Sequence, residues 1–295
     1  MKSVKKSSAA RSAMRLAVML VCGVSLLHQP ADATDVTNAT NAAAGRIEIG
    51  GQPATQAQLI AFLKTADVLL LGEFHDNPRH HDLRAMLLRL LSERGFQVVV
   101  EHLNAPEKMA PGSPETQLRR LEAAGFDQKG WRWPIHKPLI DTSDALGLDL
   151  WGANLGREQF RNPPPANLLE ILDRAPLSRG AQTRLDEDLR VGHCGMLPEE
   201  HIGSVRSAQR LRDASMAVVA QQRAPSIVLL GNGHARKDYG VPQILRATHP
   251  ALRVISVGFI EDPLKDAATF DATWQTPRLE RPDPCEELRK QFKRP

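Results

Sequence analysis

Short apolar runs recur along this chain, and turn-forming residues separate them from longer segments with helical spacing. Runs of four to eight apolar residues bounded by turns are typical of strands that are buried on both faces. The predicted strands lie at 68–71, 97–100, 148–151, 227–230 and 254–257. Because helical segments alternate with them, the sequence predicts an α/β fold with a mostly parallel central sheet flanked by helices.

The first of these strands is followed by the clearest helix of the chain. Asn77 is a good N-cap, Pro78 suits the first helical position, and Gly95 suits the end. The predicted apolar face consists of Leu83, Met86, Leu87, Leu90 and Leu91. A strand, a helix and a second strand in this order form a βαβ crossover, so we expect the strands at 68–71 and 97–100 to pair in parallel.

A single domain is predicted over residues 46–295, with a flexible, polar lead-in at 34–45. Residues 156–222 are mainly helical in pattern, and their last helix begins after Pro198. We expect this stretch to be a helical insertion that covers one end of the sheet.

Residues 1–33 have the order of segments found in a secretory signal peptide. Five basic side chains precede an apolar run from Leu16 to Leu27, and a small-x-small cleavage site follows at Ala31–Ala33. This run is shorter than the ~20 residues that a membrane-spanning helix needs. We therefore expect an exported protein, with no transmembrane segment after signal removal, in the periplasm or at the periphery of the outer membrane.

The cysteines fit export. Cys22 lies within the signal and follows Val21 rather than the small residue of a lipobox, so we expect no lipid on it. The mature chain keeps Cys194 and Cys285. An even count in an oxidising compartment predicts a disulfide between them, with two buried free thiols as the alternative.

The net charge of the chain argues against nucleic acid as a partner. The net charge is +4, but the first 33 residues hold five basic side chains against one acidic one, so the rest of the chain is close to neutral. General binding to nucleic acid needs a basic face. We therefore expect no nucleic-acid partner.

Candidate chemistry gathers where the predicted strands end. Two of them are followed by the same spacing, a glycine, two residues and a histidine, which gives His75 and His234. We expect each glycine to permit a sharp turn. Glu101 follows the strand at 97–100, and Glu73 lies two residues before His75. Because parallel strands bring their carboxyl ends to one edge of the sheet, these four side chains are predicted to converge.

Two kinds of chemistry suit that group. His75, His234 and Glu101 could bind Zn²⁺ or Mn²⁺ and leave a position open for water. Without a metal, Glu73 or Glu101 could orient His75 as a general base. For the neighbouring His80 and His81, the pattern leaves open whether they flank the pocket or lie exposed in the first helical turn.

Tyr239 adds a third kind of chemistry, the ligation of iron. It is the only tyrosine of the chain and follows His234 by five residues. If it lies beside a pocket, its oxygen could ligate ferric iron.

Six separated stretches carry a family resemblance. They are LLLGEFHDNP (69–78), VEHL (100–103), GANL (152–155), HCGMLPEE (193–200), GNGHARKDYGVP (231–242) and DPC (283–285). Through them the chain resembles the ChaN family, haem-binding proteins of the cell envelope linked to iron acquisition.

That resemblance implies haem as the ligand. It implies Tyr239 or one of the histidines His75 and His234 as the axial ligand, and Arg236 or Lys237 as the partner of the haem propionates. It leaves open whether the protein forms a homodimer.

The wider group to which the chain is similar includes the Tiki proteases and the erythromycin esterases. These share paired Gly-x-x-His motifs and a glutamate, a pattern that falls here on Glu73, His75, Glu101 and His234. This second resemblance implies hydrolysis of a peptide or ester as the alternative to haem binding without turnover.

Overall fold

The computed structural model describes residues 45–156, 164–263, 267–283, 285–286 and 289. The chain divides into two units, residues 1–40 and 41–295. The predicted signal peptide at 1–33 and all but the last residue of the predicted lead-in at 34–45 lie outside the described residues. No helix in the described part of the chain is long and apolar enough to cross a membrane.

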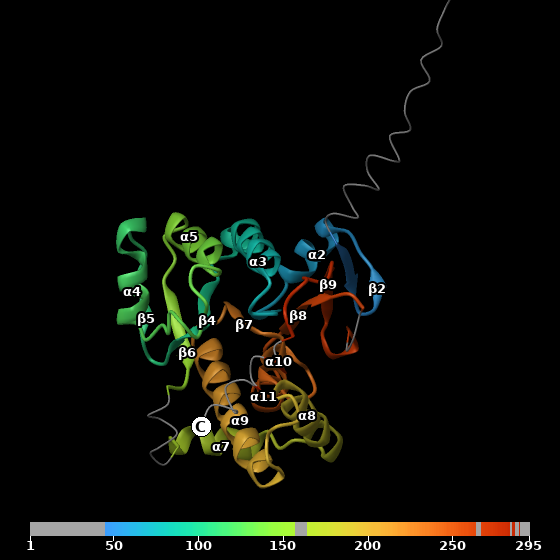
Figure 1. Ribbon diagram of the computed structural model, residues 1–295. Helices are drawn as coiled ribbons and strands as arrows, with labels where there is room; N and C mark the ends of the chain where they lie inside the picture. Colours follow the sequence, from blue (N-terminus) through green and yellow to red (C-terminus); the bar gives the residue numbers. More distant parts are fainter. Residues whose placement is uncertain (1–44, 157–163, 264–266, 284, 287–288, 290–295) are drawn as a thin grey trace, which may run out of the picture. The chain divides into compact units, whose positions relative to one another are not determined.

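A nine-stranded sheet forms the centre of the larger unit, with its strands in the order β2-β1-β9-β8-β3-β7-β4-β6-β5 (Figure 1). The strands are β1 Arg46–Ile49, β2 Gln52–Pro53, β3 Val68–Glu73, β4 Gln97–Asn104, β5 Lys108–Met109, β6 Leu150–Asn154, β7 Ser226–Gly231, β8 Val254–Glu261 and β9 Ala272–Thr276. The helices are α2 Gln56–Leu63, α3 Pro78–Leu91, α4 Gln117–Ala123, α5 Lys137–Ala145, α7 Ala166–Arg174, α8 Arg179–Gly192, α9 Glu199–Gln222, α10 Asn232–Ala235 and α11 Val241–Thr248.

The sheet is mostly parallel, which confirms the predicted α/β class. All pairings from β9 through β8, β3, β7 and β4 to β6 are parallel, whereas β1, β2 and β5 pair antiparallel at the edges. β3 and β4 run parallel, but the predicted pairing between them is wrong, because β7 is hydrogen-bonded between the two strands. The two strands that carry the Gly-x-x-His motifs, β3 and β7, therefore lie side by side.

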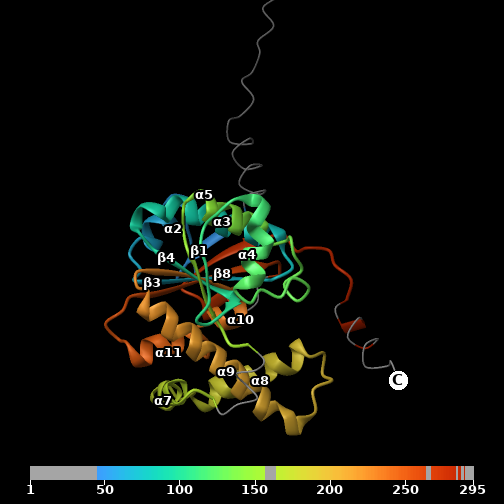
Figure 2. The same ribbon diagram turned by 90° about the vertical axis from the view of Figure 1, so that its left-hand side faces the viewer.

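Side chains of these strands alternate between two cores. Leu69 and Leu71 of β3 pack in one core with α2, α3 and α5, and Val68 and Leu70 pack in the other with α7, α9 and α11. Figure 2 shows these two helix layers on opposite sides of the sheet. Strands buried on both sides explain the unbroken apolar runs of the sequence.

Helix α3 begins and ends where the sequence predicts. The Asn77 side chain accepts a hydrogen bond from the backbone N–H of Arg79, and Gly95 ends the following 3-10 turn at φ 66°. The predicted buried face is wrong in part. Leu90 is 40% exposed, whereas His80, His81 and Arg84 are fully buried. The helix is rotated so that these polar residues reach the end of β3.

The stretch predicted as a helical insertion contains α7, α8 and α9 in its described part, residues 164–222. Side chains of α7 and α9 pack in the second core beneath the sheet. The predicted start of the last helix after Pro198 is confirmed.

A disulfide joins Cys194, which follows α8, to Cys285 near the C-terminal end of the described chain. Their Cα atoms are 5.5 Å apart. The predicted pairing is confirmed, and the alternative of two free thiols is wrong.

We predict that Cys285→Ser lowers the free energy of unfolding by about 4 kcal/mol, because the bridge restricts a long loop of the unfolded chain. Urea unfolding with and without reductant measures the effect. The reductant should destabilise the wild type and leave the variant unchanged. Equal stability of the two proteins under oxidising conditions would contradict the prediction.

Candidate functional site

The alternation of side chains along the strands divides the candidate site between the two faces of the sheet. In β3, Glu73 continues the face of Leu69 and Leu71, which α3 and α5 cover. In β4, His102 extends the same face. Glu101 lies on the opposite face, toward α9 and α10, where it contacts His234. The site is therefore built from two halves that meet at the carboxyl ends of the strands.

Glu73 is the centre of the first half. Its carboxylate is 2% exposed and forms an ion pair with the fully buried Arg84. It also lies 2.9 Å from Nδ1 of His75 and 2.8 Å from Nδ1 of His81. Burial alone would raise the pKa of Glu73, but Arg84 and the histidine hydrogen bonds outweigh it and hold that pKa well below its usual value. Glu73 is therefore ionised and contacts Arg84 and His81 of α3 as well as His75 beyond the end of β3.

His75 lies just beyond β3 and joins the two halves. Its Nδ1 faces Glu73, and its Nε2 is 4.0 Å from Oε1 of Glu101. Its side chain is 44% exposed, and the edge of its ring meets Trp131 at a centroid distance of 5.0 Å. Burial lowers the pKa of His75, but Glu101 and Glu73 together raise it above its usual value. Of the clustered histidines, His75 is the one that reaches the surface.

Glu101, His234 and Asp213 form the second half. Oε2 of Glu101 accepts a hydrogen bond from the backbone N–H of Gly231 at 2.7 Å. Its Oε1 is 3.4 Å from Nε2 of His234, whose Nδ1 contacts Asp213 of α9 at 2.6 Å. Burial opposes a charge on the His234 ring, but the two carboxylates raise the pKa of His234 to about 10. His234 is thus an imidazolium held between two acids.

The paired glycines serve close packing rather than the sharp turn that the sequence suggested. A Cβ on Gly231 would lie 2.7 Å from Nε2 of His75. A Cβ on Gly72 would lie 2.5 Å from the side-chain oxygen of Asn232 and 2.8 Å from Ala235. Each glycine of one motif therefore makes room for the residues that follow the other strand.

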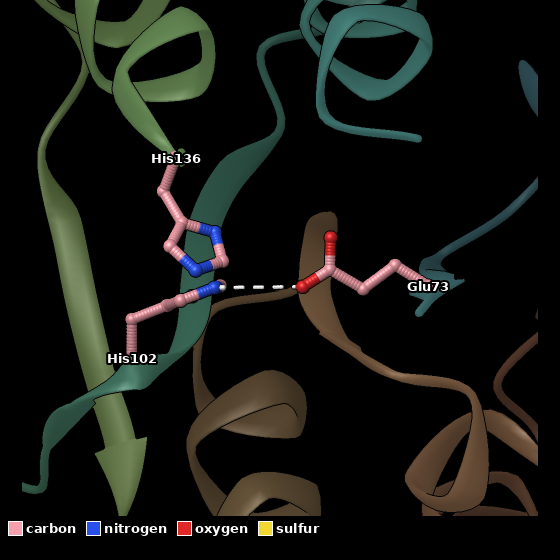
Figure 3. A group of neighbouring side chains, drawn as sticks. All are labelled: Glu73, His102 and His136. Carbon is pink, nitrogen blue, oxygen red and sulfur yellow. Dashed lines mark ion pairs between the residues drawn. The ribbon is translucent and has the colours of Figure 1, made fainter. Parts of the chain in front are cut away.

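His102 and His136 complete the first half beneath Trp131. His136 stands at the start of α5, and its ring centroid is 4.4 Å from that of His102 and 4.2 Å from that of His81 (Figure 3). Burial lowers the pKa of both His102 and His136, so both rings are neutral. Sequence reasoning assigned no role to His136, and no motif in the chain marks it.

Sequence reasoning also passed over Arg84 and Asp213. Arg84 is three residues after His81 on the same side of α3, and that spacing could have placed it with the buried histidines. Asp213 follows Arg212 in α9 and precedes Ala214, and no motif in the chain marks it.

The open question of His80 and His81 is settled, since both are fully buried. His81 belongs to the site through Glu73. His80 accepts a hydrogen bond from the backbone N–H of Phe74 and contacts the hydroxyl of Thr276 at 3.0 Å. Burial lowers the pKa of His80 to about 3, so this ring is a neutral structural link between α3 and β9.

A model of the family described as haem-binding uptake proteins, Tiki superfamily, ChaN, matches residues 59–245. The chain belongs to this family. No curated protein sequence matches it.

Solved structures similar to this ChaN-family chain include "Cofacial heme binding to ChaN of Campylobacter jejuni", with 21% identity, a TM-score of 0.61, and coverage of 78% of this chain and 95% of that one. The likeness shows a common fold. RRSP, a toxin effector domain from Vibrio vulnificus, has 15% identity and a TM-score of 0.38, and covers 76% of this chain and 38% of that one. The type III effector HopBA1 has 12% identity and a TM-score of 0.37, and the match covers 74% of this chain and 91% of that one. These two are too distant to support an argument.

The other side chains of this ChaN-family chain that the sequence offered for haem binding are those of Tyr239, Arg236 and Lys237. They contact other residues than the four at the strand ends. The Tyr239 side chain is 2% exposed and donates a hydrogen bond to Asp188 of α8. Burial raises the pKa of Tyr239 above its usual value, so the phenol stays protonated. Arg236 is bonded to Asp238, and Lys237 is 3.4 Å from Asp271. These three side chains are engaged with carboxylates of their own chain.

The residues predicted to bind a metal ion also differ from those whose donor atoms lie close together in the structure. Nδ1 of His234 is held by Asp213, and the donor atoms of His75, His234 and Glu101 do not form a group compact enough for one metal ion in the described part of the chain. Among the described residues, Glu73, His102 and His136 are the ones whose donor atoms lie close enough together for one metal ion.

We predict that His234 makes the stability of this protein fall between pH 6.5 and about 10. In this window the folded ring keeps a proton that the unfolded ring loses, because the folded pKa is raised from 6.5 to about 10. The contribution is complete below pH 6.5 and is lost as the pH rises, at no more than about 1.4 kcal/mol per pH unit.

Urea unfolding of the wild type and of His234→Gln from pH 6 to 10 measures this slope. The slope should be shallower in His234→Gln than in the wild type. His201→Gln, which replaces an exposed histidine of α9, is the matched control and should keep the wild-type slope. An NMR titration in which the His234 ring loses its proton near its ordinary pKa would contradict the assignment.

Proposed function

We propose that this chain binds haem at the cell envelope and takes part in haem or iron acquisition, with His75 as the axial ligand. Membership of the haem-binding ChaN family supports the ligand. The observation that carries the choice of residue is the exposed ring of His75, whose Nδ1 is held by the buried carboxylate of Glu73.

His75 has the features that iron ligation needs. A histidine ligand uses one ring nitrogen for the metal and donates the other to an oriented acceptor, which fixes the ring and increases its basicity. Glu73 is such an acceptor, and it is itself fixed by Arg84. The side chain of His75 is 44% exposed, so we expect a large planar ligand to reach Nε2 from the side away from Gly231. His234 and Tyr239 are buried and already bonded, so they suit this role less.

The surroundings of His75 suit a porphyrin. The half-buried Trp131 packs against the ring of His75, whereas the 41% exposed Phe74 lies beside His80. The apolar ring of a haem held by His75 would meet Trp131. Arg132 follows Trp131, and its side chain is 66% exposed and 3.9 Å from Asp76. We therefore assign the propionates to Arg132 rather than to Arg236 or Lys237.

The envelope location rests on the sequence and on the disulfide. Residues 1–33 have the pattern of a signal peptide, and the bridge between Cys194 and Cys285 suits an oxidising compartment. The ChaN of Campylobacter jejuni, which shares this fold, is described as binding haem cofacially. We extend haem binding to this chain on that basis, and the homodimer stays a prediction.

We predict that titration with haemin produces a saturable Soret shift in the wild type. His75→Ala should weaken the apparent affinity by roughly tenfold or more, because the iron loses its protein ligand. His201→Ala is the matched histidine control, and Tyr239→Phe should bind like the wild type. Sedimentation velocity on the same samples reports whether haem-loaded protein is a homodimer.

Absence of wild-type binding at micromolar haemin would contradict haem as the ligand. Normal binding by His75→Ala with loss in Tyr239→Phe would contradict the axial assignment alone.

A second function is supported by a different observation. Oε1 of Glu101 lies within 4.0 Å of Nε2 of His75 and within 3.4 Å of Nε2 of His234. A water beside Glu101 and His75 could lose a proton to the His75 ring, whose Nδ1–H is held by Glu73. The neighbouring imidazolium of His234 could stabilise negative charge on a carbonyl oxygen. This arrangement supports hydrolysis of an ester or a peptide.

We predict for this second function that haem-free protein hydrolyses p-nitrophenyl esters or members of a fluorogenic peptide library. Glu101→Gln should lower the rate on the order of 100-fold. This variant should still bind haemin, because His75 remains. Absence of turnover by the wild type, or equal turnover by Glu101→Gln, would contradict the hydrolytic function and leave haem binding unaffected.

A further inference from the structure

Three buried donor groups from separate elements face one another beneath Trp131. They are Glu73 of β3, His102 of β4 and His136 at the start of α5. Their exposures are 2%, 5% and 1%, and one donor atom of each lies within 4.8 Å of the other two. Figure 3 shows the carboxylate of Glu73 directed at the ring of His102, with the ring of His136 directly above.

The two histidines lack the hydrogen bonds that buried polar atoms require. Among the residues that the structure describes, Nε2 of His102 and both ring nitrogens of His136 have no hydrogen-bond partner. The separation of 3.7 Å between Nε2 of His102 and Oε1 of Glu73 is too long for a hydrogen bond. Leaving buried nitrogens unsatisfied is costly, so these rings are suited to a ligand that binds both of them.

The space beside the rings is small. A cavity of about 10 Å³ adjoins His102 and His136, and its other walls are mainly leucine, isoleucine and valine side chains. An enclosed space of this size holds at most about one water molecule. Glu73 does not line this cavity, so the cavity shows only that there is a small space beside the two imidazoles.

We propose that Glu73, His102 and His136 form a binding site for one divalent transition-metal ion of the Zn²⁺ class. Two neutral imidazoles and a carboxylate are a common ligand set for such ions, with a fourth position for water. Two ligand atoms about 2.1 Å from a tetrahedral metal lie roughly 3.4 Å apart. The observed 3.7 Å between Glu73 and His102 is close to this separation.

The charges around the three residues are compatible with an added cation. One oxygen of Glu73 is paired with Arg84, and the other, Oε1, faces both His75 and His102. Oε1 can therefore ligate the ion while Arg84 keeps its partner. The three ligands do not include His75, His234 or Glu101, although Oε1 of Glu73 also holds Nδ1 of His75, and the site goes beyond haem binding.

The test uses protein stripped with EDTA and free of haem. Co²⁺ is the spectroscopic probe, because four-coordinate Co²⁺ has intense visible absorption, and Zn²⁺ then displaces it in competition. His102→Gln and His136→Gln each remove one ligand, and His201→Gln is the matched control on the surface of α9. His234→Gln reports on the other group of residues. Thermal unfolding of each metal-free variant checks that it is folded.

We expect one Co²⁺ per chain in the wild type, in His201→Gln and in His234→Gln. His102→Gln or His136→Gln should weaken the binding by roughly tenfold or more. If one of these two variants does not fold, the other decides the test, together with the rise in Tm that Zn²⁺ should cause in the wild type.

Three results would overturn the proposal. These are no saturable Co²⁺ binding by the wild type, unchanged binding by both ligand variants, and binding that His234→Gln abolishes but His136→Gln preserves. Haemin binding by the same protein is measured separately, so failure of either proposal can be recognised by itself.

Discussion

The ion pair between Glu73 and Arg84 is the interaction on which the candidate site depends. Both side chains are buried, and one comes from the end of β3 while the other comes from α3. A buried carboxylate without this cation would be strongly unfavourable. With it, Glu73 stays ionised and can accept His75 and His81 as further partners. The orientation of His75, which both proposed functions use, is thus a consequence of a charge that α3 neutralises.

The adjacency of β3 and β7 is the second constraint. Because these strands are neighbours and parallel, their terminal histidines approach Glu101 from two sides. The close packing at Gly72 and Gly231 permits this approach, since a side chain at either position would collide with the opposite motif. The repeated Gly-x-x-His spacing therefore serves close packing. Each glycine leaves room for the motif of the other strand, and both histidines approach Glu101.

Much of this arrangement could be predicted from local sequence. The apolar runs define the strands, Asn77 and Pro78 define the start of α3, and two strand-end histidines with Glu101 define the edge of the sheet where they meet. These features depend on neighbouring residues or on the common direction of parallel strands, so a single sequence contains the information.

The remaining features depend on tertiary contacts. The buried side of α3 carries His80, His81 and Arg84 because Glu73 and β9 attract them, and the leucine spacing alone indicated a different side. Asp213 and His136 come from helices that are distant in sequence, and only the folded chain brings them to His234 and His102. Tyr239 follows His234 closely along the chain, yet its side chain turns toward Asp188 of α8.

The most direct test of the central role of Glu73 is the unfolding free energy of Arg84→Met, compared with that of Arg89→Met, an exposed arginine on the same helix. We predict that Arg84→Met costs about 3 to 5 kcal/mol, because it leaves a buried carboxylate without its cation. Adding Glu73→Gln to the same chain should recover a large part of this loss. Arg84→Met with no greater cost than Arg89→Met would contradict the account.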